Sequence, residues 1–203
     1  MSVPSVSENR VSDDVDQWSL IQPPPDGYTA DDLDRIPDLP PHTELIDGSL
    51  VLVSPQKLFR MLVLKLLERE LDRQVPEYLL VAREFSVKLG KRQRPEPDLL
   101  LVRRDVFDEL DQTWVPPETV ELAVEVVSPE SEIRDRERKP ELYARAGIPH
   151  FWRVEKDGDD AVVYVHELDP ASGRYGRPSI HRAVLKTTVP FDIDINLAAL
   201  GPY

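Results

Sequence analysis

The spacing of apolar residues predicts a chain in which helices and strands alternate. From residue 58 to residue 71, leucine and methionine recur at near-helical spacing, which indicates a well-buried helix. From 79 to 89, apolar and polar residues alternate, which is typical of a half-buried strand with Glu84 on its polar side. Short continuous apolar runs at 98–102 and 120–127 are typical of central strands covered on both faces.

Turn and capping residues divide the N-terminal half further. Residues 29–37 begin with threonine and acidic residues and end in proline, which predicts a short capped helix. Asp47-Gly48 separates the apolar segments 44–46 and 50–53. This dipeptide favours a two-residue hairpin, because both positions tolerate positive φ. Ser54-Pro55 predicts the cap and first turn of the next helix.

The C-terminal half continues the alternation. Residues 131–146 are charged and then amphipathic, and Gly147 is placed to end this helix. Strands are predicted at 151–154 and 161–168, and the tail at 180–195 supplies one or two more. The predicted order is a helix, three strands, a helix and a strand, with hairpins at both ends. This order indicates an α/β or α+β fold.

Composition limits the class of protein. The 203 residues suit one domain, and the polar, acidic residues 1–27 predict a mostly disordered lead-in to a single domain at 28–203. Twenty prolines, about twice the average usage, exclude a simple helical bundle. The absence of cysteine excludes disulfides, zinc–thiolate sites and cysteine nucleophiles. No apolar run approaches the roughly 18 residues of a membrane span, so we expect a soluble, cytoplasmic protein.

The charge distribution matters more than the total. A net charge of −13 argues against a nucleic-acid partner, but residues 1–40 hold nine acidic residues and only two basic ones. The segment 86–104 carries six basic residues against two acidic ones. The candidates for phosphate contacts in this segment are Lys88, Lys91, Arg92 and Arg94. The alternative is that these charges only keep a loop solvated.

Two carboxylates occupy positions where a strand prefers apolar groups. Asp98 opens one apolar run and Glu125 lies inside another. Burying an isolated carboxylate costs several kcal/mol unless the group is paired or binds a metal. Two acids on adjacent strands suit Mg²⁺, which takes one or two protein carboxylates and keeps several waters. The alternative is that Asp98 only enters its strand and Glu125 faces solvent.

Several short motifs follow one another in a specific order across residues 28–170. They are Glu44 to Gly48 with Ser54-Pro55, Pro97-Asp98, Glu125 to Pro129, Arg134-Asp135 with Lys139 and Tyr143, and Gly147 to Pro149 before Phe151-Trp152. As a set they resemble the PD-(D/E)XK nuclease superfamily, and more closely its Uma-two family of restriction-endonuclease-like proteins. The resemblance implies a restriction-endonuclease-like αβββαβ core, with a mixed central sheet flanked by helices. It also implies Mg²⁺-dependent hydrolysis of DNA.

The resemblance assigns roles to five residues. Asp98 and Glu125, helped by the backbone carbonyl of Val126, would hold Mg²⁺, with Mn²⁺ as a possible substitute. Lys139 would orient the attacking water or stabilise charge on the phosphate, and Glu44 would add a carboxylate through a metal-bound water. The alternatives are a solvated helix charge for Lys139 and a strand-end charge for Glu44.

This chain departs from the superfamily pattern at two places. The third motif position, usually lysine, is Val127, and the resemblance places the lysine at Lys139 on the next helix. Pro140 follows Lys139, so we expect Lys139 at a helix start or kink. Near the start of the first core helix, where the family often has histidine, this chain has Lys57 to Arg60.

Two hypotheses of different classes remain at this point. The first is a metal-dependent endonuclease that acts as a homodimer, with Phe151, Trp152 and the strands beyond residue 160 supplying apolar surface. The second is a nonenzymatic interaction or regulatory protein that keeps the nuclease fold. The retained Asp98 and Glu125 favour the first, whereas the net charge and the Lys139-Pro140 junction favour the second.

Overall fold

The structure is a computed structural model that describes residues 23–52 and 56–200. The predicted cap at Ser54-Pro55 and residues 1–22 of the predicted lead-in lie outside the described residues. The central sheet contains β3 (Leu79–Arg83), β5 (Leu99–Arg103), β7 (Val120–Val126), β8 (His150–Asp157), β9 (Asp160–Asp169), β10 (Arg174–Tyr175) and β11 (Ser179–His181). Its order is β10-β9-β8-β7-β5-β3, and β11 also pairs with β9.

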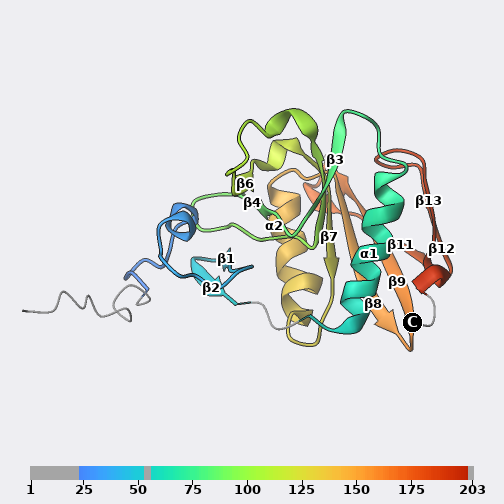
Figure 1. Cartoon of the computed structure of the whole chain (residues 1–203), viewed down its shortest axis with the longest axis horizontal. Helices are drawn as coiled ribbons and strands as arrows, with labels where there is room; N and C mark the ends of the chain where they lie inside the picture. The colour runs from blue at the N-terminus through green and yellow to red at the C-terminus, as the bar shows by residue number, and fades with distance from the viewer. Residues whose placement is uncertain (1–22, 53–55, 201–203) are drawn as a thin grey trace, which may run out of the picture.

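Two helices cover opposite faces of this sheet (Figure 1). They are α1 (Leu58–Asp72) and α2 (Lys139–Arg145), the latter preceded by a π-helical turn at Arg134–Arg138. The strand pairs of the sheet are antiparallel except β7 and β8, which are parallel and joined through α2. The sequence α1-β3-β5-β7-α2-β8 confirms the expected αβββαβ core with a mixed sheet flanked by helices.

Smaller elements flank the sheet. These are the hairpin β1 (Glu44–Ile46) and β2 (Ser49–Val51), the parallel pair β4 (Ser86–Val87) and β6 (Trp114–Val115), the hairpin β12 (Val184–Thr187) and β13 (Ile193–Asn196), and 3-10 helices at Ala30–Asp34, Arg104–Val106, Pro117–Thr119 and Leu197–Leu200. The two-residue turn predicted at Asp47-Gly48 is confirmed, since both residues have positive φ, 54° and 79°.

Alternation along β5 and β7 sorts their side chains between two cores. Leu99 and Val124, which are register partners, pack into the core beneath α1. Leu100 and Ala123, the next partners, pack into the core beneath α2. Successive side chains of a strand point to opposite faces, so Glu125, the neighbour of Val124, belongs on the α2 face. Asp98 immediately precedes β5, next to the Leu99–Val124 pair, and so lies beside Glu125 at the same end of the two strands.

The strand predicted at 79–89 is interrupted. Glu84 has a φ of 49°, a conformation that non-glycine residues rarely adopt, and it separates β3 from β4. Its backbone N–H donates to the Asp98 carbonyl at 3.1 Å, and Ser86, expected on the polar side, is buried. The prediction of one half-buried strand was therefore wrong, because the chain turns at Glu84 to follow the segment before β5.

The apolar surface expected for a dimer does not come from Phe151 and Trp152. Both side chains are fully buried, one in each core of the chain itself, so that part of the reasoning was wrong. Ile180 and Val184, beyond residue 160, are about half exposed. Among the described helices, none combines the length and apolar character needed to cross a membrane.

Arg94, predicted to contact nucleic acid, is a buried structural residue. Its side chain is 4% exposed and forms a two-pronged ion pair with Asp34, at 2.7 and 2.9 Å. It also donates to the carbonyls of Ala30 and Thr113, and its own backbone pairs with Leu45 in β1. Arg94 therefore fastens the N-terminal segment and hairpin to the body of the protein.

Replacing this guanidinium should destabilise the fold. We expect Arg94→Ala to lower the free energy of unfolding by about 3 kcal/mol, because it removes four hydrogen bonds and leaves Asp34 with only the Thr113 hydroxyl as a side-chain donor. Lys91→Ala, on an exposed neighbour, should change it by less than about 0.5 kcal/mol. Urea unfolding of both variants checks this, and equal midpoints would contradict it.

Candidate active site

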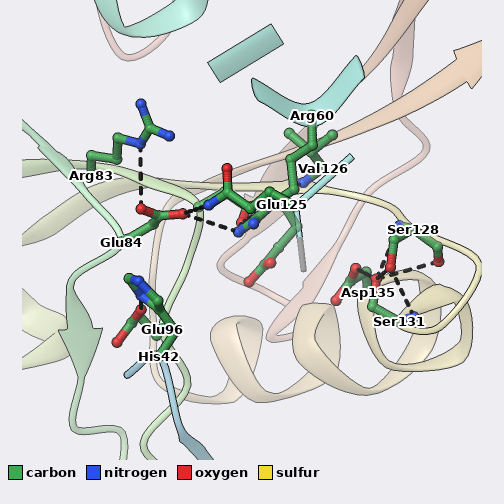
Figure 2. Close-up of polar contacts among 12 residues, drawn as sticks. His42, Arg60, Arg83, Glu84, Glu96, Glu125, Val126, Ser128, Ser131 and Asp135 are labelled. Carbon is green, nitrogen blue, oxygen red and sulfur yellow. Dashed lines mark hydrogen bonds and ion pairs between the residues drawn. The ribbon is translucent and has the colours of Figure 1, made fainter. Parts of the chain in front are cut away.

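A pocket of about 250 Å³ opens where the start of α1, the end of β7 and the π-helical turn before α2 meet. Its described lining includes the carboxylates Glu44, Asp98, Glu125 and Asp135, the cations Arg60 and Lys139, and Val126 to Ser131. Figure 2 shows Arg60, Glu125, Val126 and Asp135 together with the neighbouring polar residues. The pocket therefore gathers segments from Glu44 to Lys156, which are 112 positions apart in the sequence.

Asp98 lies directly before β5, at the end of the β5–β7 pair that faces the pocket. Its carboxylate is 6% exposed, and one oxygen accepts the backbone N–H of Val126 on the adjacent strand. The other oxygen accepts Nε of Arg60 at 3.0 Å and also contacts the Arg60 Nη2. Asp98 is thus fixed by one backbone and one guanidinium contact.

Glu125 is buried and faces α2. Its side chain is 2% exposed, which removes the alternative that it faces solvent. One oxygen accepts the Tyr143 hydroxyl at 2.6 Å and the other accepts the Lys139 ammonium at 3.0 Å. Both partners come from α2, four residues apart, so one helix face fixes the orientation of this carboxylate.

Lys139 lies at the centre of an acidic cluster. Its Nζ is 2.7 Å from Glu44, 3.0 Å from Glu125 and 3.6 Å from Asp135. The same Glu44 oxygen also accepts the backbone N–H of Glu96 at 2.8 Å. The alternative of a solvated charge is therefore wrong for Lys139. Glu44 does stand at the end of a strand, as the first residue of β1, but its carboxylate is buried and paired with Lys139.

The expectation for Lys139 and Pro140 is confirmed. Lys139 is the first residue of α2 and follows the π-helical turn directly, and Pro140 falls in the first turn of α2, where a missing N–H costs little. Lys139 itself is helical, with φ −62° and ψ −45°. Asp135, Lys139 and Tyr143 follow one another at every fourth residue, so that Lys139 and Tyr143 contact Glu125 and Asp135 lies 3.6 Å from Lys139.

The cluster carries more negative than positive charge. Four buried carboxylates, Glu44, Asp98, Glu125 and Asp135, are contacted by two cations, Arg60 and Lys139. Burial raises the pKa of Glu125 well above its usual value, the Lys139 charge opposes this, and the neighbouring carboxylates raise the pKa further. Burial likewise raises the pKa of Asp135. With every group ionised, the cluster lacks two positive charges.

A divalent cation matches this deficit in charge and in ligand chemistry. Carboxylate oxygens are the ligands that Mg²⁺ prefers, and one or two of them suffice when water completes the shell. Asp98 and Glu125 can supply that pair. Within residues 23–52 and 56–200, no group of three or more histidine or acidic side chains is arranged as a ready metal cage. The residues therefore fit a two-carboxylate, water-rich site.

The structure does not bring the predicted basic segment to this pocket. Lys88 contacts Asp31 and lies over the Trp114 ring, and Arg92 donates to the carbonyl of Asp47. Lys91 is exposed. The described lining of the pocket includes none of the four residues of that segment. Their contact with nucleic acid stays a prediction, except that the burial of Arg94 gives it another role.

Arg60 and Asp135 are pocket residues to which sequence reasoning gave no role. A signal for Arg60 was present: it occupies the helix face defined by Val63, Leu64 and Leu67, which are buried. A basic residue on a buried apolar face needs an acidic partner. Nothing in the local pattern, however, identifies Asp98 as that partner.

Comparisons with known proteins identify a family and a shared fold. A family model, Uma2, described as "Putative restriction endonuclease", matches residues 30–198. Among solved structures, a "putative nuclease belonging to DUF820" from Anabaena variabilis ATCC 29413 matches with a TM-score of 0.57 and 14% identity. The alignment covers 80% of this chain and 89% of that chain, and at this identity it shows a shared fold. Among curated proteins there is no significant match.

The raised pKa of Glu125 gives a pH-dependent prediction for the metal-free protein. A carboxyl whose folded pKa is raised contributes stability below its unfolded pKa and loses it as the pH rises through the folded value. Glu125→Gln should therefore raise the free energy of unfolding relative to wild type at about pH 8, and the gain should shrink toward about pH 5. Equilibrium unfolding of wild type and Glu125→Gln at both pH values, with a metal chelator present, measures this difference in free energy.

The control for this prediction lies on the same strand. Glu121→Gln, at a partly exposed position of β7, should have little effect at either pH. Burial lowers the pKa of His150, His166 and His181, which acts in the opposite direction. These histidines are common to wild type and Glu125→Gln and cancel in that comparison. In the control, the loss of Glu121 removes a charge that opposes the lowering of the His150 pKa, so any pH dependence of Glu121→Gln reports that histidine. A Glu125→Gln effect that does not change with pH would contradict the prediction.

Proposed function

Because the chain belongs to the Uma2 family of restriction-endonuclease-like proteins, we propose that it is a Mg²⁺-dependent endonuclease that hydrolyses phosphodiester bonds of DNA. The observation that carries the proposal is the excess of two negative charges in a buried cluster that lines the pocket. Burying uncompensated carboxylates costs several kcal/mol. A site that keeps them at this cost is suited to binding a divalent cation.

Each residue of the cluster has a distinct part in this proposal. Asp98 and Glu125, with the carbonyl of Val126, would hold the metal. When bound, Mg²⁺ supplies Lewis-acid stabilisation of the phosphate and lowers the pKa of a coordinated water. Lys139 donates to the phosphate oxygens, where a preorganised positive charge stabilises the negative charge that develops. Glu44 keeps Lys139 in place through the 2.7 Å ion pair, and its proposed contact to a metal-bound water is compatible with that position.

The structure also suggests which groups meet the DNA backbone. Lys57, Arg134 and Lys156 line the same pocket as the carboxylates. The Arg134 Nε is buried and has no hydrogen-bond partner among the described residues, so it is a donor available to a ligand. Positive groups beside an acidic catalytic cluster offset the repulsion that a net charge of −13 would exert on DNA.

A nonenzymatic role is favoured by one observation. Arg60 already pairs with Asp98 through two nitrogen atoms. The Lys139 ammonium pairs with Glu125. A cluster stabilised in this way can persist as a structural remnant. Metal-dependent cleavage distinguishes the two functions, because an inactive relative keeps the fold without turnover.

The homodimer and the cytoplasmic location stay predictions. Sedimentation tests the homodimer.

The catalytic assignment is tested by nicking of plasmid DNA in Mg²⁺. Asp98→Asn, Glu125→Gln and Lys139→Met should each lower the cleavage rate by at least about 100-fold, the usual effect of removing one group that stabilises the transition state. Lys65→Met, at an exposed position of α1, is the matched control and should cleave at the wild-type rate. Cleavage by Asp98→Asn at the wild-type rate would contradict the assignment.

The DNA-contact assignment is tested by binding in Ca²⁺, chosen to occupy the site without supporting cleavage. The double variant Lys57→Glu/Lys156→Glu should lower DNA affinity and reduce the log–log salt slope by roughly two, about one for each lysine–phosphate interaction removed. Lys91→Glu/Arg92→Glu makes the same charge change in the segment predicted from sequence. We expect this second double variant to change DNA affinity and the salt slope less than the first. If it changes them more, the segment predicted from sequence is the DNA-binding surface.

A further inference from the structure

Arg60 is a cation placed where the proposed metal would bind. It projects from α1 into the pocket, and its side chain is 16% exposed. Its Nε and Nη2 both contact the same Asp98 oxygen, while the other Asp98 oxygen is occupied by the Val126 N–H. A divalent cation at Asp98 would therefore compete with Arg60 for that oxygen, because two cations in one low-dielectric site repel each other.

Arg60 has a second carboxylate within reach. The Arg60 Nη2 lies 3.5 Å from Glu84, whose carboxylate is also 16% exposed. Glu84 is itself fixed by Gln56, by the side chain of Arg83 at 3.4 Å, and by its left-handed backbone conformation. Figure 2 shows the Glu84 carboxylate between Arg83 and Arg60. The break between β3 and β4, which puts Glu84 at this point, thus provides a prepared acceptor for the guanidinium.

We propose that Arg60 is a built-in competitor of the metal, which neutralises Asp98 in the metal-free protein and transfers to Glu84 when a divalent cation binds. This inference rests on the proposed metal site and adds a residue that sets its affinity. The two carboxylates flank one guanidinium, so the transfer needs a change of hydrogen-bond partner rather than a movement of the helix. Arg60 lowers the affinity of the site for metal because it competes for Asp98. Glu84 raises that affinity because it can accept the guanidinium in place of Asp98.

The test is calorimetric titration of Mn²⁺ into the metal-free full-length chain. Arg60→Gln should bind Mn²⁺ about tenfold more tightly than wild type, since removing a competing charged hydrogen bond changes the equilibrium by about that factor. Glu84→Gln should bind roughly fivefold more weakly, because Arg60 then has only Asp98 as its close acidic partner. Arg69→Gln, an exposed arginine of the same helix paired with Glu70, is the matched control and should bind as wild type.

The double variant separates competition from ligation. If Glu84 acts only through Arg60, then Arg60→Gln/Glu84→Gln should bind Mn²⁺ as tightly as Arg60→Gln. If Glu84 is itself a ligand, the double variant will be weaker than Arg60→Gln, and this result would overturn the proposed exchange. An affinity of Arg60→Gln that is equal to or weaker than that of Arg69→Gln would also overturn it.

The failure of this inference can be told from failure of the proposed function. If neither wild type nor Arg60→Gln binds Mn²⁺, the metal site itself is wrong and the exchange falls with it. If wild type binds Mn²⁺, Asp98→Asn does not, and Arg60→Gln matches the control, only the Arg60 inference is wrong. Should Arg60→Gln fail to fold, Arg60→Lys, which keeps the charge without the two-pronged contact, should bind with intermediate affinity; wild-type affinity would overturn the proposal.

Discussion

The structure depends on one electrostatic constraint, which is the burial of four carboxylates whose ion pairs, among the described residues, come from two cations, Arg60 and Lys139. Glu44, Asp98, Glu125 and Asp135 come from the N-terminal hairpin, the segment entering β5, strand β7 and the turn before α2. Each of these elements must be in place for Lys139 to contact three of the acids. Loss of any one acid changes the charge balance that the others experience.

Elements that look peripheral are therefore part of the site. The hairpin that carries Glu44 is fastened by the backbone pairing of Leu45 with Arg94, and the Arg94 side chain holds the neighbouring N-terminal segment through its ion pair with Asp34. The π-helical turn has a comparable effect on the other side, because it leads into α2 with Lys139 as its first residue. π-Turns occur frequently at functional sites, where they redirect a side chain. Stability and site geometry are consequently coupled in this protein.

The competition between cations at Asp98 also reconciles the two functional hypotheses. Asp98 and Glu125 are each already paired with a cation, Arg60 and Lys139 respectively, and these two contacts need no metal, as in an inactive relative. The same site can accept a divalent cation if the resident cations have other partners. Glu84 serves Arg60 in this way, and Glu44 with Asp135 serves Lys139. Metal affinity then depends on these partners as well as on the ligands.

The sequence by itself determined the local elements and predicted that two acids lie on adjacent strands. Apolar periodicity located α1, a continuous apolar run located β7, and the Asp47-Gly48 turn located the first hairpin. The burial of Asp98 and Glu125 beside each other, where the sequence left a solvent-facing alternative open, came from the structure. Only the tertiary structure decided which charges meet, because Arg60 and Asp98 are 38 positions apart and no local pattern encodes their contact. The break at Glu84 and the burial of Arg94 likewise depend on segments packed from elsewhere in the chain, since a periodic pattern shows which side of an element is apolar but not which partner covers it.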